Sequence, residues 1–443
     1  MLWPSLPRFI ATSRLVLLLA LGAPLWVIPV FVPMMGLIPL LYLMALAAVL
    51  VFEGATLPAQ QLVSASRNYA KRFTLGREYG LTLTIAHQHS QTLRLQIHEN
   101  LPPAFDVLET LPAFYVGPAR TATVSYRVVC RIRGIHELGY IKVAASHRWH
   151  LIQRVYRFEP DDTARIYPDL RDIGQYELLA MLDNQQDQQQ LRLKRAAGRD
   201  FESLRPYLRG DDLRFIHWKA SSKRGQLISK NFQIEQGQRL SILIDTGRFM
   251  EEAVEGVPRL EYAIRAAVLL AYVAQVRGDT VSVACFSNRV ESIMAPTRGQ
   301  KILPLVLDTL CDVQARRYES DYWQVIAGLL AGLNKRSLII IFTDVIDLAG
   351  STGLLNNLIQ AASKHLVLCV VFNDRELEGL LQEEPQAEKG LYNQAAASYI
   401  NANRKHVFES MRARGIMVLE AYPEKLTNLL INQYLQIRRE SLQ

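Results

Sequence analysis

Near its N-terminus the chain carries an apolar run that is too long for a single transmembrane helix. Residues 15–52 form a stretch of 38 residues without one charged side chain. One straight helix of that length would measure about 57 Å, whereas the hydrocarbon core of a bilayer is about 30 Å thick. Helix-breaking residues interrupt the middle of the run: Pro24, Pro29, Pro33 and Gly36. The run therefore predicts a hairpin of two short helices, about Ser13–Val30 and Met34–Phe52, which turns near Pro29–Gly36.

The charges on either side of the run predict its orientation. Arg8 and Arg14 precede it, and four more cations follow it: Arg67, Lys71, Arg72 and Arg77. Because both flanks are basic and the turn is uncharged, we expect both ends in the cytoplasm, which in a bacterium means a two-helix anchor in the inner membrane. A cleavable signal peptide is the alternative. However, the apolar stretch is longer than the hydrophobic core of a signal peptide, and it lacks a clear small-x-small cleavage site.

The rest of the chain has the composition of an ordinary folded protein. Of its 443 residues, 49% are hydrophobic and 21% are charged, which excludes a disordered chain. This length corresponds to roughly three domains. The four cysteines, none of them in a CxxC pair, lie in apolar runs: Cys130, Cys285, Cys311 and Cys369. We expect them to be buried reduced thiols, without zinc or a disulfide framework.

Between residues 70 and 169 the apolar residues recur with a period of two. Three such runs are Leu81–Leu83–Ile85, Leu93–Leu95–Ile97 and Val124–Tyr126–Val128. Short alternating runs separated by turns are typical of an antiparallel sandwich, which we interpret as a spacer or docking module. His87 and His89 share one strand face, but without a nearby carboxylate or cysteine set we interpret them as solvated histidines rather than metal ligands. The polar stretch 183–190 predicts a linker.

Residues 240–443 alternate apolar strands with helices, which indicates an α/β domain with a parallel sheet covered on both faces. The predicted strands are 240–245, 280–286, 337–342, 365–372 and 416–420, and the predicted helices are 260–277, 300–311, 321–333, 352–363, 391–413 and one from Pro423. Asp245 ends the first strand, and Thr343–Asp344 follow the third. Since ligands gather at the carboxyl ends of parallel strands, we expect these residues to converge at one rim.

The positive charge of the chain is concentrated in residues 192–230. This segment holds eleven cations and four anions, a net +7 out of a total of +8, interleaved with aromatic and aliphatic side chains. Three interpretations remain open. Arginines beside aromatic residues suit nucleic acid, and the acids Glu202, Asp211 and Asp212 suit a divalent cation in a phosphoester hydrolase. Arginine–aspartate pairs that lock the segment in place, with Trp218 as a buried anchor, are the favoured interpretation.

Residues 198–250 carry a dense pattern of motif positions. The pattern has a phenylalanine, an LR-x-Y, a GD, an R-x-I-x-W-K and a strand that ends in aspartate. It lies at Phe201, Leu204, Arg205, Tyr207, Gly210, Asp211, Arg214, Ile216, Trp218, Lys219 and Asp245. This segment closely resembles the signature of domain-of-unknown-function family fifty-eight, bacterial membrane proteins with a von Willebrand factor type A-like (Rossmann-like) domain. The resemblance extends to the order of the parts: a membrane hairpin, a strand-rich segment ending at Tyr167–Leu170, and the α/β domain.

In type A domains the rim is a metal-ion-dependent adhesion site with a D-x-S-x-S strand end, a loop threonine and a further aspartate. The resemblance implies Asp245, Ser320 and Asp344 as a degenerate ligand set for Mg²⁺, with Ser320 standing for the threonine. Gly247 and Phe249 replace the two serines. The alternative is a vestigial site, in which Asp245 and Asp344 are hydrogen-bonded or paired with Arg248.

The sequence thus predicts four parts: a transmembrane hairpin (1–56), a β-sandwich-like domain (57–182), a linker with the arginine-rich motif (183–239) and the type A-like domain (240–443). Without a P-loop, a GxSxG motif, a Cys–His pair or a metalloprotease helix, we expect no enzyme. The resemblance implies a non-enzymatic, membrane-anchored adaptor that acts with a MoxR-type AAA+ ATPase in chaperone-like maturation of a client protein. The alternative is a nucleic-acid-binding or phosphoester-hydrolysing protein that uses residues 192–230.

Overall fold

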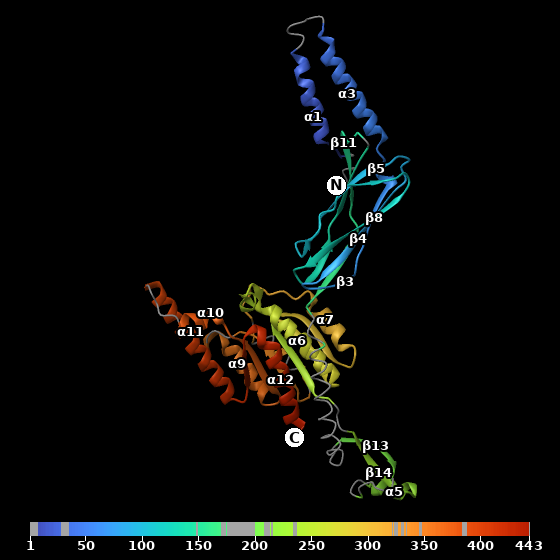
Figure 1. The fold of residues 1–443 in the computed structure, drawn as a ribbon. Helices are drawn as coiled ribbons and strands as arrows, with labels where there is room; N and C mark the ends of the chain where they lie inside the picture. The colour runs from blue at the N-terminus through green and yellow to red at the C-terminus, as the bar shows by residue number, and fades with distance from the viewer. Residues whose placement is uncertain are drawn as a thin grey trace. The chain divides into compact units, whose positions relative to one another are not determined.

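The computed structural model describes most of the chain. The described residues are 8–27, 35–147, 149–169, 174, 200–207, 213, 216–233, 237–320, 322, 327–328, 332–333, 335–344, 348–382 and 388–442. They divide into two compact units, residues 1–167 and 168–443 (Figure 1), and each unit is described separately below. The predicted linker 183–190 lies outside the described residues, and the predicted four-part division stays a prediction.

Two apolar helical segments follow strand β1 (Arg8–Ala11) in the first unit. Helix α1 (Ser13–Gly22) continues into a 3₁₀ turn (Ala23–Trp26), and α3 (Leu37–Thr56) lies beside it (Figure 1). The Tyr42 hydroxyl donates a hydrogen bond to the Leu18 carbonyl at 2.7 Å. Among the described residues, α3 is the one helix long and apolar enough to cross a membrane. The first segment is shorter than predicted, and α3 runs past the predicted end at Phe52.

The remainder of this unit consists of three sheets built mainly from antiparallel strands. Their orders are β1-β11-β10-β5-β7, β2-β4-β8-β6 and β3-β12-β9, with β3 and β12 parallel. The strands are β1 (Arg8–Ala11), β2 (Val63–Asn68), β3 (Arg72–Thr74), β4 (Glu78–His87), β5 (Leu93–Glu99), β6 (Phe105–Val107), β7 (Phe114–Val116), β8 (Thr121–Cys130), β9 (Gly134–Leu138), β10 (Ile141–Ser146), β11 (Ile152–Phe158) and β12 (Asp162–Tyr167), and a 3₁₀ turn (Gln60–Leu62) precedes β2.

The alternating pattern of the sequence explains how this unit is held together. Of the residues that the pattern selected, most are buried in one common core that joins β4, β5 and β8, and Val124 is partly buried against it. Strand residues at alternate positions point to the same face, so each run delivers its apolar side chains to that core. Cys130 and the other three cysteines are buried and form no disulfide bond, as predicted. His87 is also buried, which corrects the expectation of a solvated histidine.

The second unit is organised around a mixed six-stranded sheet with the order β19-β18-β15-β20-β21-β22. Five strands are parallel, and β19 is antiparallel to β18. The strands are β15 (Arg239–Asp245), β18 (Thr280–Phe286), β19 (Val290–Arg298), β20 (Leu338–Phe342), β21 (Leu366–Phe372) and β22 (Met417–Ala421). The parallel strands were predicted within one or two residues, whereas β19 was not predicted, because most of its residues are partly or fully exposed and it lacks a buried apolar run.

Helices cover both faces of this sheet. One core contains residues of α6, α7 and α12, and the core on the opposite face contains residues of α9 and α11. The helices are α6 (Arg259–Val276), α7 (Ile302–Cys311), α9 (Leu348–Ala362), α10 (Arg375–Gln382), α11 (Glu388–Ala413) and α12 (Pro423–Leu442). A 3₁₀ turn (Arg248–Met250) and a short hairpin, β16 (Ala253–Val254) and β17 (Val257–Pro258), lie between β15 and α6. Most of the predicted helix 321–333 lies outside the described residues.

A separate hairpin carries part of the sequence motif. It consists of β13 (Asp200–Pro206) and β14 (Ile228–Gln233), which are antiparallel, together with α5 (Trp218–Arg224). Gly225 ends α5 with a φ of 67°, a left-handed conformation that glycine adopts without strain.

Candidate functional site

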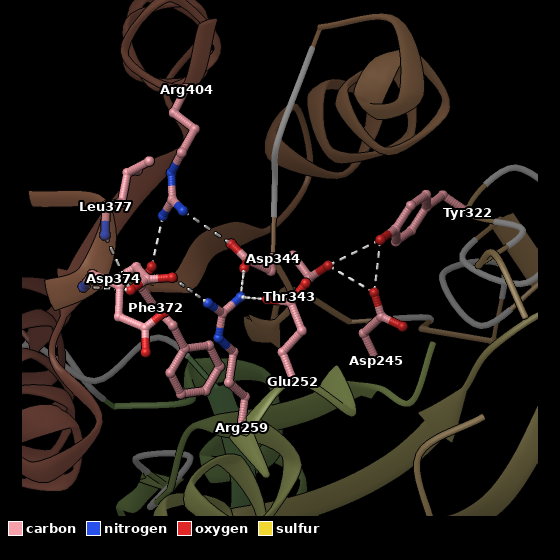
Figure 2. Close-up of polar contacts among 11 residues, drawn as sticks. Asp245, Glu252, Arg259, Tyr322, Thr343, Asp344, Phe372, Asp374, Leu377 and Arg404 are labelled. Atoms are coloured by element: carbon pink, nitrogen blue, oxygen red, sulfur yellow. Dashed lines mark hydrogen bonds and ion pairs between the residues drawn. The ribbon is translucent and has the colours of Figure 1, made fainter. Parts of the chain in front are cut away.

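The carboxyl ends of β15 and β20 bring Asp245 and Thr343 together, as the strand pattern predicted. The Thr343 hydroxyl donates to Asp245 Oδ2 at 2.8 Å, and the Tyr322 hydroxyl donates to the same oxygen at 2.7 Å (Figure 2). Burial, followed by the charge of Asp245, raises the pKa of Tyr322, so its hydroxyl stays protonated and remains a donor. Asp245 thus lies at the centre of a buried hydrogen-bond network.

Ser320 also contacts Asp245. Its hydroxyl donates to Asp245 Oδ1 at 2.5 Å, and the backbone N–H of Gly247 donates to the same oxygen at 2.8 Å. A Cβ atom at Gly247 would overlap the Ser320 hydroxyl. The missing serine side chain at position 247 therefore leaves space that Ser320 fills from a different loop.

Asp344 lies beside this network but has different partners. Its carboxylate pairs with Arg259, and Arg404 Nη1 lies 3.6 Å from its other oxygen (Figure 2). Arg259 also reaches Asp374 and Glu252, each at 3.0 Å. The side chains of Arg259 and Asp344 are only 4% and 1% exposed. Asp344 is therefore neutralised by buried guanidinium groups.

The predicted Mg²⁺ ligands do not fit a divalent cation in this arrangement. Mg²⁺ needs several oxygen ligands in near-octahedral geometry. Asp245 accepts hydrogen bonds from four donors, and Asp344 faces two positively charged guanidinium groups. Within the described ranges, no group of three or more His, Cys, Asp or Glu side chains is arranged to hold a metal ion. The alternative, a vestigial site, is found in part: both carboxylates have hydrogen-bond or ion-pair partners, but Arg248 is not one of them. Arg248 pairs with Glu319 at 3.3 Å.

A serine at position 247 tests whether Ser320, packed against Asp245, excludes a side chain there. We expect Gly247→Ser to destabilise the second unit by about 1–3 kcal/mol, because the new side chain overlaps the Ser320 hydroxyl. Combining it with Ser320→Ala should recover part of that loss. Chemical unfolding of the four variants of this double-mutant cycle measures the coupling. Gly379→Ser is the control, because a Cβ atom there meets nothing within 4 Å; additive effects of the two rim substitutions would contradict the assignment.

Several residues of the rim were missed by sequence reasoning. Arg259, Tyr322 and Arg404 lie on elements whose contacts with the rim depend on the tertiary fold. Asp374 carried a usable signal, because it follows an apolar strand, as Asp245 and Asp344 do. Its carboxylate also accepts the N–H of Glu376 at 2.8 Å at the start of α10.

The family-motif residues are only partly described. Phe201 and Arg205 lie on β13, Tyr207 follows it, and Trp218 and Lys219 begin α5, whereas Gly210, Asp211 and Arg214 lie outside the described residues. Trp218 is 68% exposed. The prediction that it is a buried anchor is therefore wrong, because the side chain at the first position of α5 faces solvent. Among the described residues of this segment, Ile216 and Ile228 are buried instead.

Three histidines of the first unit lie close together. His89 and His147 have ring centroids 5.7 Å apart, and His87 adds to the electrostatic environment of His89. Burial, followed by the charges of His147 and His87, lowers the pKa of His89 below its ordinary value of 6.5. The folded chain therefore binds fewer protons here than the unfolded chain does.

This shift predicts a pH dependence of stability. The contribution of His89 is fully present above its unfolded pKa of about 6.5 and is lost as the pH falls through the lower folded pKa. We expect His89→Gln to make the melting temperature of the detergent-solubilised chain less sensitive to acidification in that window. His98→Gln, at an exposed position on β5, is the control. Parallel pH profiles for wild type and His89→Gln would contradict this expectation.

Comparison with known proteins finds one family model that overlaps most of the motif and much of the rim. A family model described as "Protein of unknown function DUF58" matches residues 203–385. A curated relative, "Uncharacterized protein YeaD" of Bacillus subtilis (strain 168), is 28% identical over 155 residues, which are 34% of this chain and 37% of the relative. The chain thus matches little more than a third of that relative's length.

Likeness to solved structures is weak. Native alpha-2-macroglobulin from Escherichia coli is 15% identical with a TM-score of 0.20, over 24% of this chain and 16% of that one. The ASH/PapD-like domain of human CEP192 is 13% identical with a TM-score of 0.20, over 26% and 92%. A FixG-related protein from Vibrio parahaemolyticus is 10% identical with a TM-score of 0.18, over 24% and 96%. TM-scores this low do not establish a shared fold or a shared function.

The resemblance inferred from the motif is thus supported by the family model and by the relative: residues 203–385 match the model of the DUF58 family, proteins of unknown function.

Proposed function

We propose that this protein is a membrane-anchored, non-enzymatic adaptor whose von Willebrand factor type A-like domain binds a partner protein without a metal ion. The proposal rests on one observation: the carboxylates of the rim already have their hydrogen-bond and ion-pair partners within the protein. Asp245 accepts four hydrogen bonds, and Asp344 is held by Arg259 and Arg404. Carboxylates with such partners are poor general bases, but they hold the surrounding loops in one conformation.

The anchor is supported by the way in which the first unit holds its helices. Strand β1 comes directly before α1 and pairs with β11, with Arg8 opposite Val155 and Ala11 opposite Ile152. At the end of α3, Glu53 accepts hydrogen bonds from the backbone N–H groups of Leu151 and Ile152. Both outer ends of the helical pair therefore attach to one sheet. This favours a two-helix hairpin with both ends on the same side of the bacterial inner membrane, which the basic flanks assign to the cytoplasm.

The proposed partner is a MoxR-type AAA+ ATPase, as the family resemblance implies, and the proposed role is chaperone-like maturation of a client protein. Exposed ion pairs surround the buried rim, and they offer polar groups to a partner. Arg248 pairs with Glu319, and Arg317 pairs with Glu251 at 3.1 Å. Such exposed pairs contribute little to folding, so they are free to exchange partners on binding.

Co-purification tests this proposal. The tagged full-length chain is extracted from membranes in mild detergent containing EDTA, and bound proteins are identified by mass spectrometry. We expect a MoxR-type ATPase with the wild type and its loss with the double charge reversal Arg248→Glu/Arg317→Glu. The control is Arg131→Glu, an exposed position of the first unit. Recovery of no ATPase, or equal recovery with the rim variant, would overturn the proposal. Recovery of nucleic acid instead would favour the alternative function of residues 192–230.

A further inference from the structure

Four residues lie where the two helices meet the strands of the first unit: Phe9 on β1, Arg14 at the start of α1, Phe52 near the end of α3, and Trp149 between β10 and β11. We call them the interfacial ring. Arg14 Nη1 donates to the Trp149 carbonyl at 3.3 Å, and the rings of Phe52 and Trp149 lie 6.0 Å apart. Phe52 is 60% exposed and Trp149 is 50% exposed. Segments distant in the sequence thus bring exposed aromatic side chains and Arg14 together, and Arg154 adds a second cation 5.6 Å from the centroid of the Phe9 ring.

Glu53 marks the point on α3 where the helix meets the strands. Its carboxylate is buried, and the N–H groups of Leu151 and Ile152 satisfy it at 3.2 and 3.3 Å. The charge therefore faces the strands and not the outer surface of the helix. On that outer surface the apolar residues continue through Val51 and Phe52, both of which are exposed. The apolar surface of α3 thus ends where the ring begins.

Close packing keeps the ring in place. The backbone of Phe9 is held in register opposite Arg154 on β11. A Cβ atom at Gly54 would meet Ile152 at 3.4 Å and the Phe9 ring at 3.9 Å, so the small residue lets α3 approach both strands. The Thr12 hydroxyl donates to the Leu151 carbonyl at 3.0 Å. The ring is therefore tied to α1, α3 and the sheet together.

We propose that the interfacial ring binds the boundary between the headgroups and the acyl chains of a phospholipid bilayer, so that the sheet rests directly on the membrane. This inference rests on the proposed membrane anchor and adds a second lipid contact, in which Phe9 on β1 and Trp149 in a loop join Arg14 and Phe52 of the helices. Tryptophan prefers this depth because its ring is apolar and its N–H needs a polar partner. Phenylalanine supplies apolar area beside it, and a guanidinium binds lipid phosphate in bidentate fashion. The ring is continuous with the apolar surface of α3, which supports a bilayer as its occupant.

Nitroxide depth measurements on the full-length chain in phospholipid nanodiscs test the inference. Because all four native cysteines are buried, cysteines introduced at exposed positions can be labelled selectively. Three variants are compared: Trp149→Cys in the ring, Val51→Cys on the outer surface of α3, and Ile135→Cys on β9, in a different sheet. Collisions with oxygen report lipid, and collisions with a water-soluble nickel chelate report water.

The three positions should show a graded result. We expect oxygen collisions to dominate at position 51, nickel collisions to dominate at position 135, and both to be substantial at position 149. If position 149 behaves like position 135 while position 51 is lipid-like, the ring inference fails and the anchor stands. If positions 51 and 149 are both aqueous, the anchor fails as well. Dipolar broadening between labels at position 149 would show that a second copy covers the ring, which also overturns the inference.

Discussion

Replacing Arg259 by alanine is expected to lower the free energy of unfolding of the second unit by about 3–5 kcal/mol. The guanidinium of Arg259 pairs with Asp344 and, at 3.0 Å, with Asp374 and Glu252. Without it, the buried Asp344 keeps Arg404, at 3.6 Å, as a much weaker partner. The large effect comes from a carboxylate that remains buried after its main counter-charge is gone, and not from the attraction of the pair alone.

The measurement must report on the second unit by itself, because two units unfold in one chain. Hydrogen–deuterium exchange of peptides from β15 and β20, followed through a urea titration in detergent, gives a local unfolding free energy. Arg248→Ala is the matched control, since Arg248 and Glu319 are exposed, and we expect a change below about 1 kcal/mol. Added Mg²⁺ should leave the wild-type midpoint unchanged. Equal midpoints for Arg259→Ala and Arg248→Ala would show that Arg259 does not hold the rim.

The second large effect is expected in the first unit, where Arg67→Ala should cost about 3–5 kcal/mol. Arg67 lies on β2 and pairs with Glu99 on β5 and with Asp162 on β12, so it joins all three sheets. It also donates to the Gly139 carbonyl at 3.0 Å. The side chains of Arg67 and Glu99 are fully or almost fully buried. Removing the cation leaves Glu99 buried with Tyr126 as its remaining hydrogen-bond donor among the described side chains.

A nearby exposed arginine provides the comparison. Arg127 on β8 pairs with Glu109 at 2.7 Å and with Glu78 at 3.4 Å, and all three side chains are solvent-exposed. We expect Arg127→Ala to leave the stability almost unchanged, because exposed ion pairs contribute little. Exchange of peptides from β4 and β5 through the same urea titration measures both variants. If Arg67→Ala is as mild as Arg127→Ala, the three sheets do not depend on this ion pair.

The sequence predicted well those elements whose signal is local and repeated. The period of two over 70–169 selected the residues that form the core of the first unit, because alternate strand residues face the same side. Continuous apolar runs predicted the five parallel strands of the second unit, because both faces of that sheet are covered. The same reasoning missed β19, an edge strand that is mostly exposed, and it misplaced Trp218, whose amphipathic neighbours suggested an anchor.

The positions of Asp245 and Asp344 at the rim follow from the sequence alone, because both lie at the ends of apolar strands and parallel strands align their carboxyl ends. The partners of those two carboxylates, in contrast, depend on how distant elements pack together. Arg259 is 85 residues from Asp344 and 115 residues from Asp374 along the chain. No local periodicity encodes a pair at such a separation, since it exists only once α6 is packed against the sheet. That packing puts guanidinium groups against Asp344, at the rim where the family resemblance implied a degenerate Mg²⁺ site.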